Sequence, residues 1–435
     1  MNQTDKCFDK REPRILVLTI TPWSLKGEAN TWSSLLKGRS PDCLANVYLR
    51  DGHPELLECS RNLCISEQLV VKGLFKRSLV TAKEYNEIAE STSSNESAIY
   101  SVRRGKLSTG FLRISREIFW RFGRWRTKEL DEFIDDFKPD IILHSFDNYV
   151  YKNRVAEYIA DRSGARIIGY VWDDTFTYKQ SKGLLYRLQR FIQRRSHKRL
   201  ARRVETLFAI TPKTKREAEK FFGRECELLS KPLVCDPTPC DYSKAVCPLR
   251  MVYTGNLLIG RDRTLRMLSE ALNEFNRDGV RLTLDVYTQT LLPDKVRNKI
   301  ESEYCRVHPP ISHRDVLEEQ RAADILLFIE DIGGGGRIAR LSFSTKITDY
   351  LSMGKAILAL GNADLAPIEY FSENSCAAVA TNRKEILPAL ERLCDRVVLD
   401  ELSRSAVECG LKNHSAKMIR DRFNLAIESC LEERE

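Results

Sequence analysis

Short, uninterrupted apolar runs of strand length recur along this chain, and they constrain its fold more than any other feature. They fall at residues 14–20, 140–143, 165–172, 205–210, 249–253, 281–287, 324–329 and 356–360. Because the runs are continuous rather than alternating, both faces of each strand must be covered, which is typical of parallel sheets flanked by helices. Amphipathic segments between the runs supply those helices. The sequence therefore predicts an α/β protein.

The runs form two sets, which predict two domains. Residues 231–248 (KPLVCDPTPCDYSKAVCP) separate the sets and carry four prolines without periodicity, as expected of a linker. We expect an N-terminal Rossmann-like domain over 1–235, a linker over 236–248 and a second doubly wound domain over 249–412. Ligands of such folds bind at the carboxyl ends of the strands, so a cleft between the two sheets is the expected site.

Composition excludes several other classes of protein. The 435 residues are 42% hydrophobic with a formal net charge of +9, which is a globular profile rather than a disordered one. No apolar run approaches the roughly 20 residues of a spanning helix. The thirteen cysteines are scattered, and Cys235, Cys240 and Cys247 lack metal-ligand spacing, so we expect reduced thiols, no metal site and a cytoplasmic protein.

The stretch 325–360 is the most informative one. A buried strand ends at Ile329, four glycines follow, among them Gly334 and Gly335, and Ser344-Thr345-Lys346 opens a helix that Gly354 ends. Free N–H groups, the positive end of a helix dipole and a lysine together favour a phosphate site. The alternative is a flexible glycine loop followed by an ordinary capped helix without a ligand.

The segment STKITDYLSMGKAILA, residues 344–359, resembles the donor-binding segment of GT-B glycosyltransferases, in particular the GT4-like retaining enzymes. Other landmarks of that family follow in the expected order at 138–145, 204–223, 252–272 and 321–330. The resemblance implies that the second domain binds a nucleotide-diphosphate sugar and the first domain binds the acceptor. It also implies that a C-terminal helix, 413–435, packs back toward the first domain.

The same resemblance suggests roles for individual residues of the second domain. Asp349 matches a family carboxylate that binds the ribose hydroxyls, and a carboxylate can accept two hydrogen bonds from a vicinal diol. Lys346 and Arg261 match positions that offset the charge of the diphosphate. The alternatives are a solvated helix acid and a surface arginine. The sequence departs from the family at Leu341, where a glutamate that contacts the transferred sugar is usual, and at Ser344, where proline is usual.

In the first domain, Trp172 occupies roughly the place where many relatives have a histidine, and Asp173 and Asp174 follow it. Adjacent residues of an extended chain point to opposite sides, so only one of the two acids can face the cleft. We choose Asp173 as the group that holds a sugar hydroxyl or takes the acceptor proton. The alternative is that both acids cap the following turn.

Three further residues of the first domain are candidates by their position. His144 ends the predicted strand within 138–145 and lies either at the cleft or in the core as a structural residue. Gly27 and Asn30 lie in the first strand-to-helix loop, which faces the acceptor in the relatives.

Much of the positive charge lies in two segments, 103–128 and 187–203. The second carries eight Lys and Arg and no acid, and the first carries nine against Glu117 alone, with an apolar stripe at helical spacing. Such helices can lie on an anionic membrane surface, where each cation contributes about 1 kcal/mol. Alternatively, the stripe faces the sheet and the cations are solvated. No nucleic-acid-binding motif accompanies them, so no nucleic-acid partner is expected.

Taken together, these features predict a GT4-like glycosyltransferase that moves a hexosyl group from a nucleotide-diphosphate sugar to a glycan or lipid-linked oligosaccharide, in surface polysaccharide assembly. No cofactor is expected, because no Asp-x-Asp signature accompanies the donor segment. The protein would be cytoplasmic or peripheral at the inner face of the cytoplasmic membrane. Two alternatives stay open: a catalytically inactive binding or scaffold protein, suggested by Leu341 and the missing histidine, and a sugar-nucleotide epimerase on the same fold.

Overall fold

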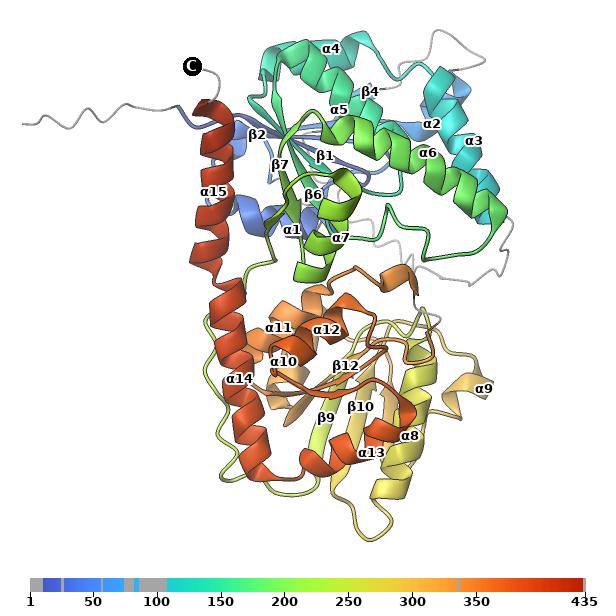
Figure 1. Ribbon diagram of the computed structural model, residues 1–435, viewed down its shortest axis with the longest axis vertical. Helices are drawn as coiled ribbons and strands as arrows, with labels where there is room; N and C mark the ends of the chain where they lie inside the picture. The colour runs from blue at the N-terminus through green and yellow to red at the C-terminus, as the bar shows by residue number, and fades with distance from the viewer. Residues whose placement is uncertain are drawn as a thin grey trace, which may run out of the picture.

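The computed structural model describes residues 11–24, 27–55, 58–73, 82–85, 108–334 and 337–432. They form two α/β domains, one above the other in Figure 1, and each has a central sheet with helices on both faces. The two doubly wound, Rossmann-like domains predicted from the sequence are thereby confirmed. None of the described helices has the length and apolar character that crossing a bilayer would require.

The first sheet has the order β4-β3-β2-β1-β5-β6-β7-β8, and only β4 runs antiparallel to its neighbour. Its strands are β1 (Ile15–Thr19), β2 (Leu44–Tyr48), β3 (Arg61–Ile65), β4 (Ala82–Glu84), β5 (Ile141–Ser145), β6 (Arg166–Val171), β7 (Val204–Ala209) and β8 (Glu227–Leu228). Its helices are α1 (Gly27–Leu36), α2 (Glu67–Lys72), α3 (Ser108–Phe122), α4 (Lys128–Phe137), α5 (Val150–Ser163), α6 (Leu184–Ala201) and α7 (Pro212–Phe222), with a 3-10 turn at η1 (Pro41–Cys43).

The second sheet is parallel throughout, in the order β11-β10-β9-β12-β13-β14. Its strands are β9 (Leu249–Thr254), β10 (Leu282–Tyr287), β11 (Cys305–His308), β12 (Ile325–Ile329), β13 (Ala356–Leu360) and β14 (Ala378–Ala380). The accompanying helices are α8 (Arg261–Phe275), α9 (Asp294–Arg297), α10 (His313–Ala322), α11 (Thr345–Met353), α12 (Ala366–Glu373) and α13 (Arg383–Arg392), with a 3-10 turn at η2 (Arg337–Ala339).

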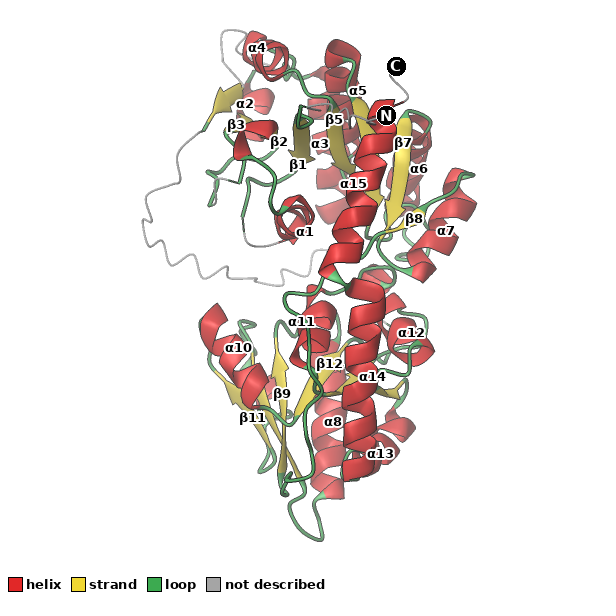
Figure 2. Cartoon of the chain, turned by 90° about the vertical axis from the view of Figure 1, so that its left-hand side faces the viewer, coloured by secondary structure: helices red, strands yellow, loops and turns green. Residues whose placement is uncertain are grey.

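Two long C-terminal helices connect the domains along one side of the molecule (Figures 1 and 2). α14 (Arg396–His414) packs on α11 and β13, and after a break at Ser415, α15 (Ala416–Glu432) packs on α1, β6 and β7 of the first domain. A second segment, residues 229–248, also crosses between the domains, and it contains neither helix nor strand. It is held beside the break at Ser415. Lys231 accepts a hydrogen bond through its carbonyl from His414 Nδ1 at 2.9 Å, and Leu233 N donates to the His414 carbonyl at 2.9 Å. Both crossings therefore meet at one point.

The domains also contact each other directly, through the segment that follows η2. Arg340 has a side chain only 1% exposed and forms ion pairs with Asp174, at 3.3 Å, and with Glu217 of α7. Thr214 Oγ1 donates to the Leu341 carbonyl at 3.1 Å, and Lys213 Nζ lies 2.8 Å from Glu369 Oε2 of α12. These polar contacts hold the carboxyl edges of the two sheets toward each other.

Candidate functional site

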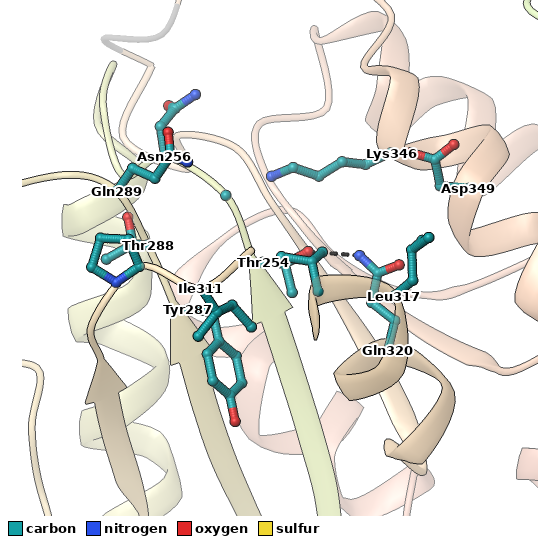
Figure 3. Close-up of a pocket in the computed structure, with 13 residues that line it drawn as sticks. Thr254, Asn256, Tyr287, Thr288, Gln289, Ile311, Leu317, Gln320, Lys346 and Asp349 are labelled. Atoms are coloured by element: carbon teal, nitrogen blue, oxygen red, sulfur yellow. Dashed lines mark hydrogen bonds between the residues drawn. The ribbon is translucent and has the colours of Figure 1, made fainter. Parts of the chain in front are cut away.

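A pocket of about 300 Å³ opens at the carboxyl ends of β9 and β10, beside α10 and α11 (Figure 3). It is lined by Thr254, Gly255, Asn256, Tyr287, Thr288, Gln289, Pro310, Ile311, Val316, Leu317, Gln320, Lys346 and Asp349. Ligands of doubly wound folds bind at this edge of the sheet. Lys346 and Asp349, both chosen from the sequence, are among the lining residues.

The first turn of α11 sets the direction of Lys346. Ser344 caps the helix, its hydroxyl accepting from Lys346 N at 3.4 Å, and Gly354 ends it with a left-handed φ of 61°, so the predicted helix is confirmed. From there the Lys346 side chain runs across the pocket mouth, and its Nζ lies 4.6 Å from the centre of the Tyr253 ring. Burial lowers the pKa of Lys346 to about 7, and nearby Arg261 acts in the same direction, while Glu330 and Asp349 oppose them.

Gly255 makes room for this lysine. Its φ is +143°, and a Cβ on it would lie only 1.9 Å from Lys346 Nζ. A side chain at this position would therefore strain the backbone and push the end of the Lys346 side chain out of its place. The loop after β9 is built so that the ammonium group can approach the backbone.

Arg261 lies in the first turn of α8 and is held by a buried carboxylate. Its Nε and Nη2 bind the two oxygens of Glu330 at 3.1 and 2.6 Å, and its Nη1 donates to Asn256 Oδ1 at 2.6 Å. Glu330 is 3% exposed. The surface-arginine alternative for Arg261 is therefore wrong, because its side chain is only 14% exposed and is held by the buried Glu330, while its Nη1 reaches the exposed pocket residue Asn256.

Asp349 lies one turn beyond Lys346 on α11, so both side chains share a helix face. Its Oδ1 is 3.4 Å from Nζ of Lys231, which comes from the segment that crosses between the domains. The carboxylate keeps about a quarter of its surface exposed. It is thus held in place yet open to a ligand in the pocket.

The residues on the pocket wall opposite Lys346 were not predicted from the sequence. Gln320 of α10 donates from Nε2 to Thr254 Oγ1 at 2.7 Å, while its buried Oε1 has no hydrogen-bond partner among the described residues. Tyr287 stacks on His308 with ring centres 4.6 Å apart, and His308 Nε2 lies 2.6 Å from Asp285. A rigid aromatic floor and an unused acceptor suit a planar group that carries an N–H donor.

Ser344, Thr345 and Gly334, which were also chosen near the glycine run, lie outside this lining. Ser344 caps α11, Thr345 is exposed in its first turn, and Gly334 has φ +73° with open space around it. Gly335 lies outside the described residues. Neighbouring Asp331 pairs with Arg263 at 3.0 Å.

Asp173 follows β6 and reaches the second domain, where it accepts a hydrogen bond from the Ser342 hydroxyl. Burial raises the pKa of Asp173 to about 6, and Asp174 adds to this, whereas the Ser342 hydrogen bond acts to lower it. Asp174 caps the following turn, accepting from Thr177 N at 3.0 Å, and it also pairs with Arg340 of the second domain. The capping alternative therefore holds for Asp174 alone, while both acids lie at the domain junction.

His144 is placed away from the pocket. It is fully buried in β5, its Nε2 is 3.0 Å from Asn153 Oδ1, and Asn153 in turn bonds His197 Nδ1 at 3.0 Å. Burial, followed by the charge of Lys152, holds the pKa of His144 well below its usual range. The geometry fits the structural alternative, and we leave His144 out of the catalytic groups.

Two other sequence candidates were on the acceptor side. Gly27 and Asn30 lie in the first turn of α1, where the structure describes the backbone but not their side chains.

Leu341, which replaces the glutamate of the family, is fully buried and belongs to the apolar cluster of the first domain. A carboxylate at this position would be desolvated among apolar groups, so this site accommodates leucine and not the glutamate of the family.

Comparisons with known proteins agree with this architecture. The fold is that of GT-B glycosyltransferases, as the resemblance had implied. Anabaena HepE in complex with UDP-glucose has a TM-score of 0.59 and 10% identity over 95% of this chain and 99% of its own. The lipopolysaccharide outer core galactosyltransferase WaaB has a TM-score of 0.57 and 14% identity, over 95% of this chain and 99% of its own. A candidate UDP-N-acetylglucosamine 2-epimerase from Listeria monocytogenes has a TM-score of 0.51 and 12% identity over 97% of both chains.

These likenesses define the fold alone, because their identities are so low. No protein-family model and no curated protein sequence matches the chain. Among the described residues, no group of three or more His, Cys, Asp or Glu side chains is placed to hold a metal ion.

Proposed function

We propose that this chain is a glycosyltransferase that binds a nucleotide-diphosphate sugar in the pocket of the second domain. The observation that carries the proposal is the pairing of Lys346 and Asp349 on one face of α11, both lining the pocket. The lysine suits a diphosphate and the carboxylate suits the vicinal hydroxyls of a ribose. The apolar and aromatic wall at Tyr287 and Ile311 suits the base.

In this proposal, Lys346 and Arg261 offset the charge that grows on the departing nucleoside diphosphate. The first domain supplies the acceptor side, where Asp173 holds a sugar hydroxyl or receives the acceptor proton. Its pKa of about 6 is closer to neutrality than that of an ordinary aspartate, as general-base work near neutral pH requires. Side-chain cations do the work here, so the proposal includes no metal.

The finer proposals rest on the resemblance of residues 344–359 to the GT4-like enzymes. We propose transfer with retention of the anomeric configuration. The acceptor in this proposal is a glycan or a lipid-linked oligosaccharide of a surface polysaccharide, glycosylated on the cytoplasmic side. The configuration of the product's new linkage, measured by NMR, tests the stereochemical part, and an inverted linkage would contradict it.

Calorimetry with the diphosphates of uridine, guanosine, adenosine and cytidine tests the binding step. We expect heat with at least one of them and roughly a 10- to 100-fold loss of affinity in Lys346→Ala, since a charged hydrogen bond contributes about 1.5–3 kcal/mol. Lys384→Ala is the matched control. Lys384 is also the second residue of a capped helix, α13, but its side chain is exposed and does not line the pocket. Binding of none of the four at millimolar concentration would overturn the proposal.

Burial of Leu341 favours one competing function, a protein that binds the nucleotide sugar without turning it over. Nucleotide release from a panel of sugar nucleotides, with and without acceptor glycans, separates the two. Release that depends on an acceptor supports the transferase, whereas binding without any release supports the scaffold. A sugar product formed without acceptor would indicate an epimerase.

A further inference from the structure

Helix α6 has an inverted distribution of polar and apolar side chains. Its outer face exposes large apolar residues, between 40% and 82% of each side chain: Leu184, Leu185, Leu188, Phe191 and Ile192. Up to residue 197 its inner face buries polar residues, and only its last turn buries apolar ones, Leu200 and Ala201; the buried polar residues are Gln189, Arg190, Gln193, Ser196 and His197. A helix that flanks a sheet ordinarily does the reverse, with its apolar stripe toward the core.

The inner polar residues fix this orientation. Arg190 is 1% exposed, and its guanidinium donates to Gln193 Oε1 at 3.1 Å and to Gln180 Oε1 at 2.7 Å. Gln193 in turn donates to the Asp147 carbonyl at 2.8 Å. Rotating the helix to bury its exposed leucines would break these buried hydrogen bonds, so the apolar face stays on the outside.

Helix α3 extends the apolar surface. It lies beside α6 on the side of the first domain away from α15 (Figure 1), and it exposes 51% of Ile118 and 73% of Phe122. A hollow of about 180 Å³ between the two helices has mostly apolar walls, with Ile192 from the side of α6, and its one carboxylate, Glu117, pairs with Arg154 in the same lining. We name the whole surface the α3–α6 face, defined by Ile118, Phe122, Leu184, Leu188, Phe191 and Ile192. The predicted basic segment also included residues 103–107, which lie outside the described part.

Cations border this face. A second hollow, of about 700 Å³, adjoins the first and is lined by Arg121, Arg154, Arg195, Lys198, Arg199 and Arg202 together with Phe191 and Ile192. Arg154 and Arg199 pair with Glu117 and Glu157, but the other four cations form no ion pair within the described residues. No carboxylate lines this hollow.

We propose that the α3–α6 face docks on the surface of an anionic lipid bilayer. Outward leucine, isoleucine and phenylalanine side chains enter the boundary between headgroups and acyl chains, and the adjoining cations bind lipid phosphates. Charge complementarity selects this occupant, because unpaired arginines and lysine beside an apolar surface match phosphates above hydrocarbon. Of the apolar stripe predicted for residues 103–128, Ile118 and Phe122 are exposed on α3, whereas Trp125, which follows the helix, is buried.

The position of the face adds a consequence that rests on the proposed function. α6 begins at Leu184, directly after the loop in which Gln180 donates to the Ile338 carbonyl of the second domain at 3.2 Å. The face therefore starts at the domain junction. A docked protein would present its cleft to an acceptor carried by a lipid.

Vesicle sedimentation of the purified full chain tests the docking. We expect the protein to bind vesicles of phosphatidylcholine mixed with phosphatidylglycerol, and to bind phosphatidylcholine alone far more weakly. Reversing three cations together, Arg195→Glu, Lys198→Glu and Arg202→Glu, removes about 1 kcal/mol each, so binding should fall at least 100-fold. The matched control reverses three exposed cations of the second domain, Arg277→Glu, Lys295→Glu and Lys299→Glu, and should bind like the parent.

The apolar part has its own pair of variants. Phe122→Asp with Phe191→Asp should abolish binding, whereas Leu291→Asp, at a residue 76% exposed in the second domain, should not. Circular dichroism and urea unfolding of every variant show that it is folded, and because neither measurement needs a nucleotide, the docking result is independent of the proposed function. Equal binding to both kinds of vesicle, no binding to either, or a dimer that Phe122→Asp dissociates would each overturn the proposal.

Discussion

The lowered pKa of Lys346 makes donor binding dependent on pH in a way that can be calculated. Burial and Arg261 bring the pKa of this ammonium to about 7, so near neutral pH half of the free protein carries the charge. Only the protonated form offers a cation to the diphosphate. The apparent affinity is the intrinsic affinity multiplied by the protonated fraction, which falls from about 0.9 at pH 6 to about 0.09 at pH 8.

We therefore expect the dissociation constant of a nucleotide sugar to rise about tenfold from pH 6 to pH 8, which equals about 1.4 kcal/mol. Affinity falls as the pH rises because the diphosphate binds the charged form of Lys346. Above its pKa the free protein must first take up a proton, which weakens the observed binding. A nucleotide sugar is the right ligand, since its diphosphate has no proton to lose in this range. Calorimetry at each pH, in buffers of different ionisation enthalpy, also counts the protons taken up.

Lys346→Met is the control, because it keeps the length of the side chain and removes the titrating group. This variant should bind more weakly at pH 6 and show a flat profile from pH 6 to pH 8. A parent protein whose affinity does not change over this range, while Lys346→Met still binds weakly, would show that the lysine stays charged. The reasoning from burial would then be refuted, although a role for the lysine would remain.

Three further changes test the rest of the site. Asp349→Asn should weaken nucleotide binding at least tenfold, and the loss should shrink with a 2′-deoxy nucleotide; an equal loss for both ligands would contradict ribose binding. Gly255→Ala should impair nucleotide binding as strongly as Lys346→Met, whereas Gly279→Ala, which has a similar φ of +138° but open space around it, should leave binding intact in calorimetry. Arg340→Met leaves two acids at the domain junction without their cation, so urea unfolding should show a loss of about 3 kcal/mol, and unchanged stability would argue against a buried ion-pair cluster.

The sequence predicted the strands that are continuous and apolar but missed others of the same sheets. β2 and β3 were overlooked because each carries a fully buried asparagine, Asn46 and Asn62, that interrupts the apolar run. Asn46 Nδ2 donates to the Val17 carbonyl of β1 at 2.8 Å. A polar side chain inside a sheet is acceptable only when a neighbouring strand supplies its partner, and a linear pattern does not show which strand that is.

Within the candidate site, local sequence signals were enough to predict the residues that lie on a single helix. The cap, the glycine stop and the spacing between Lys346 and Asp349 all lie within α11, so short-range rules place them on one face. Gln320 gave no such signal, because α10 reaches the pocket only by packing beside β9. The loop after β9 could have been found, since Thr254 to Asn256 follow directly on a predicted strand.

What the sequence determined by itself is therefore local: apolar runs that must be covered on both faces, helix ends, and residues a turn apart on a helix. These depend on backbone geometry and on contacts between near neighbours. Tertiary structure alone decided that His144 is buried, that Leu341 packs into the first domain, and that the first half of α6 turns its leucines outward. Each of these outcomes depends on hydrogen bonds or apolar contacts with segments far away in the chain, whose positions exist only once both sheets have formed.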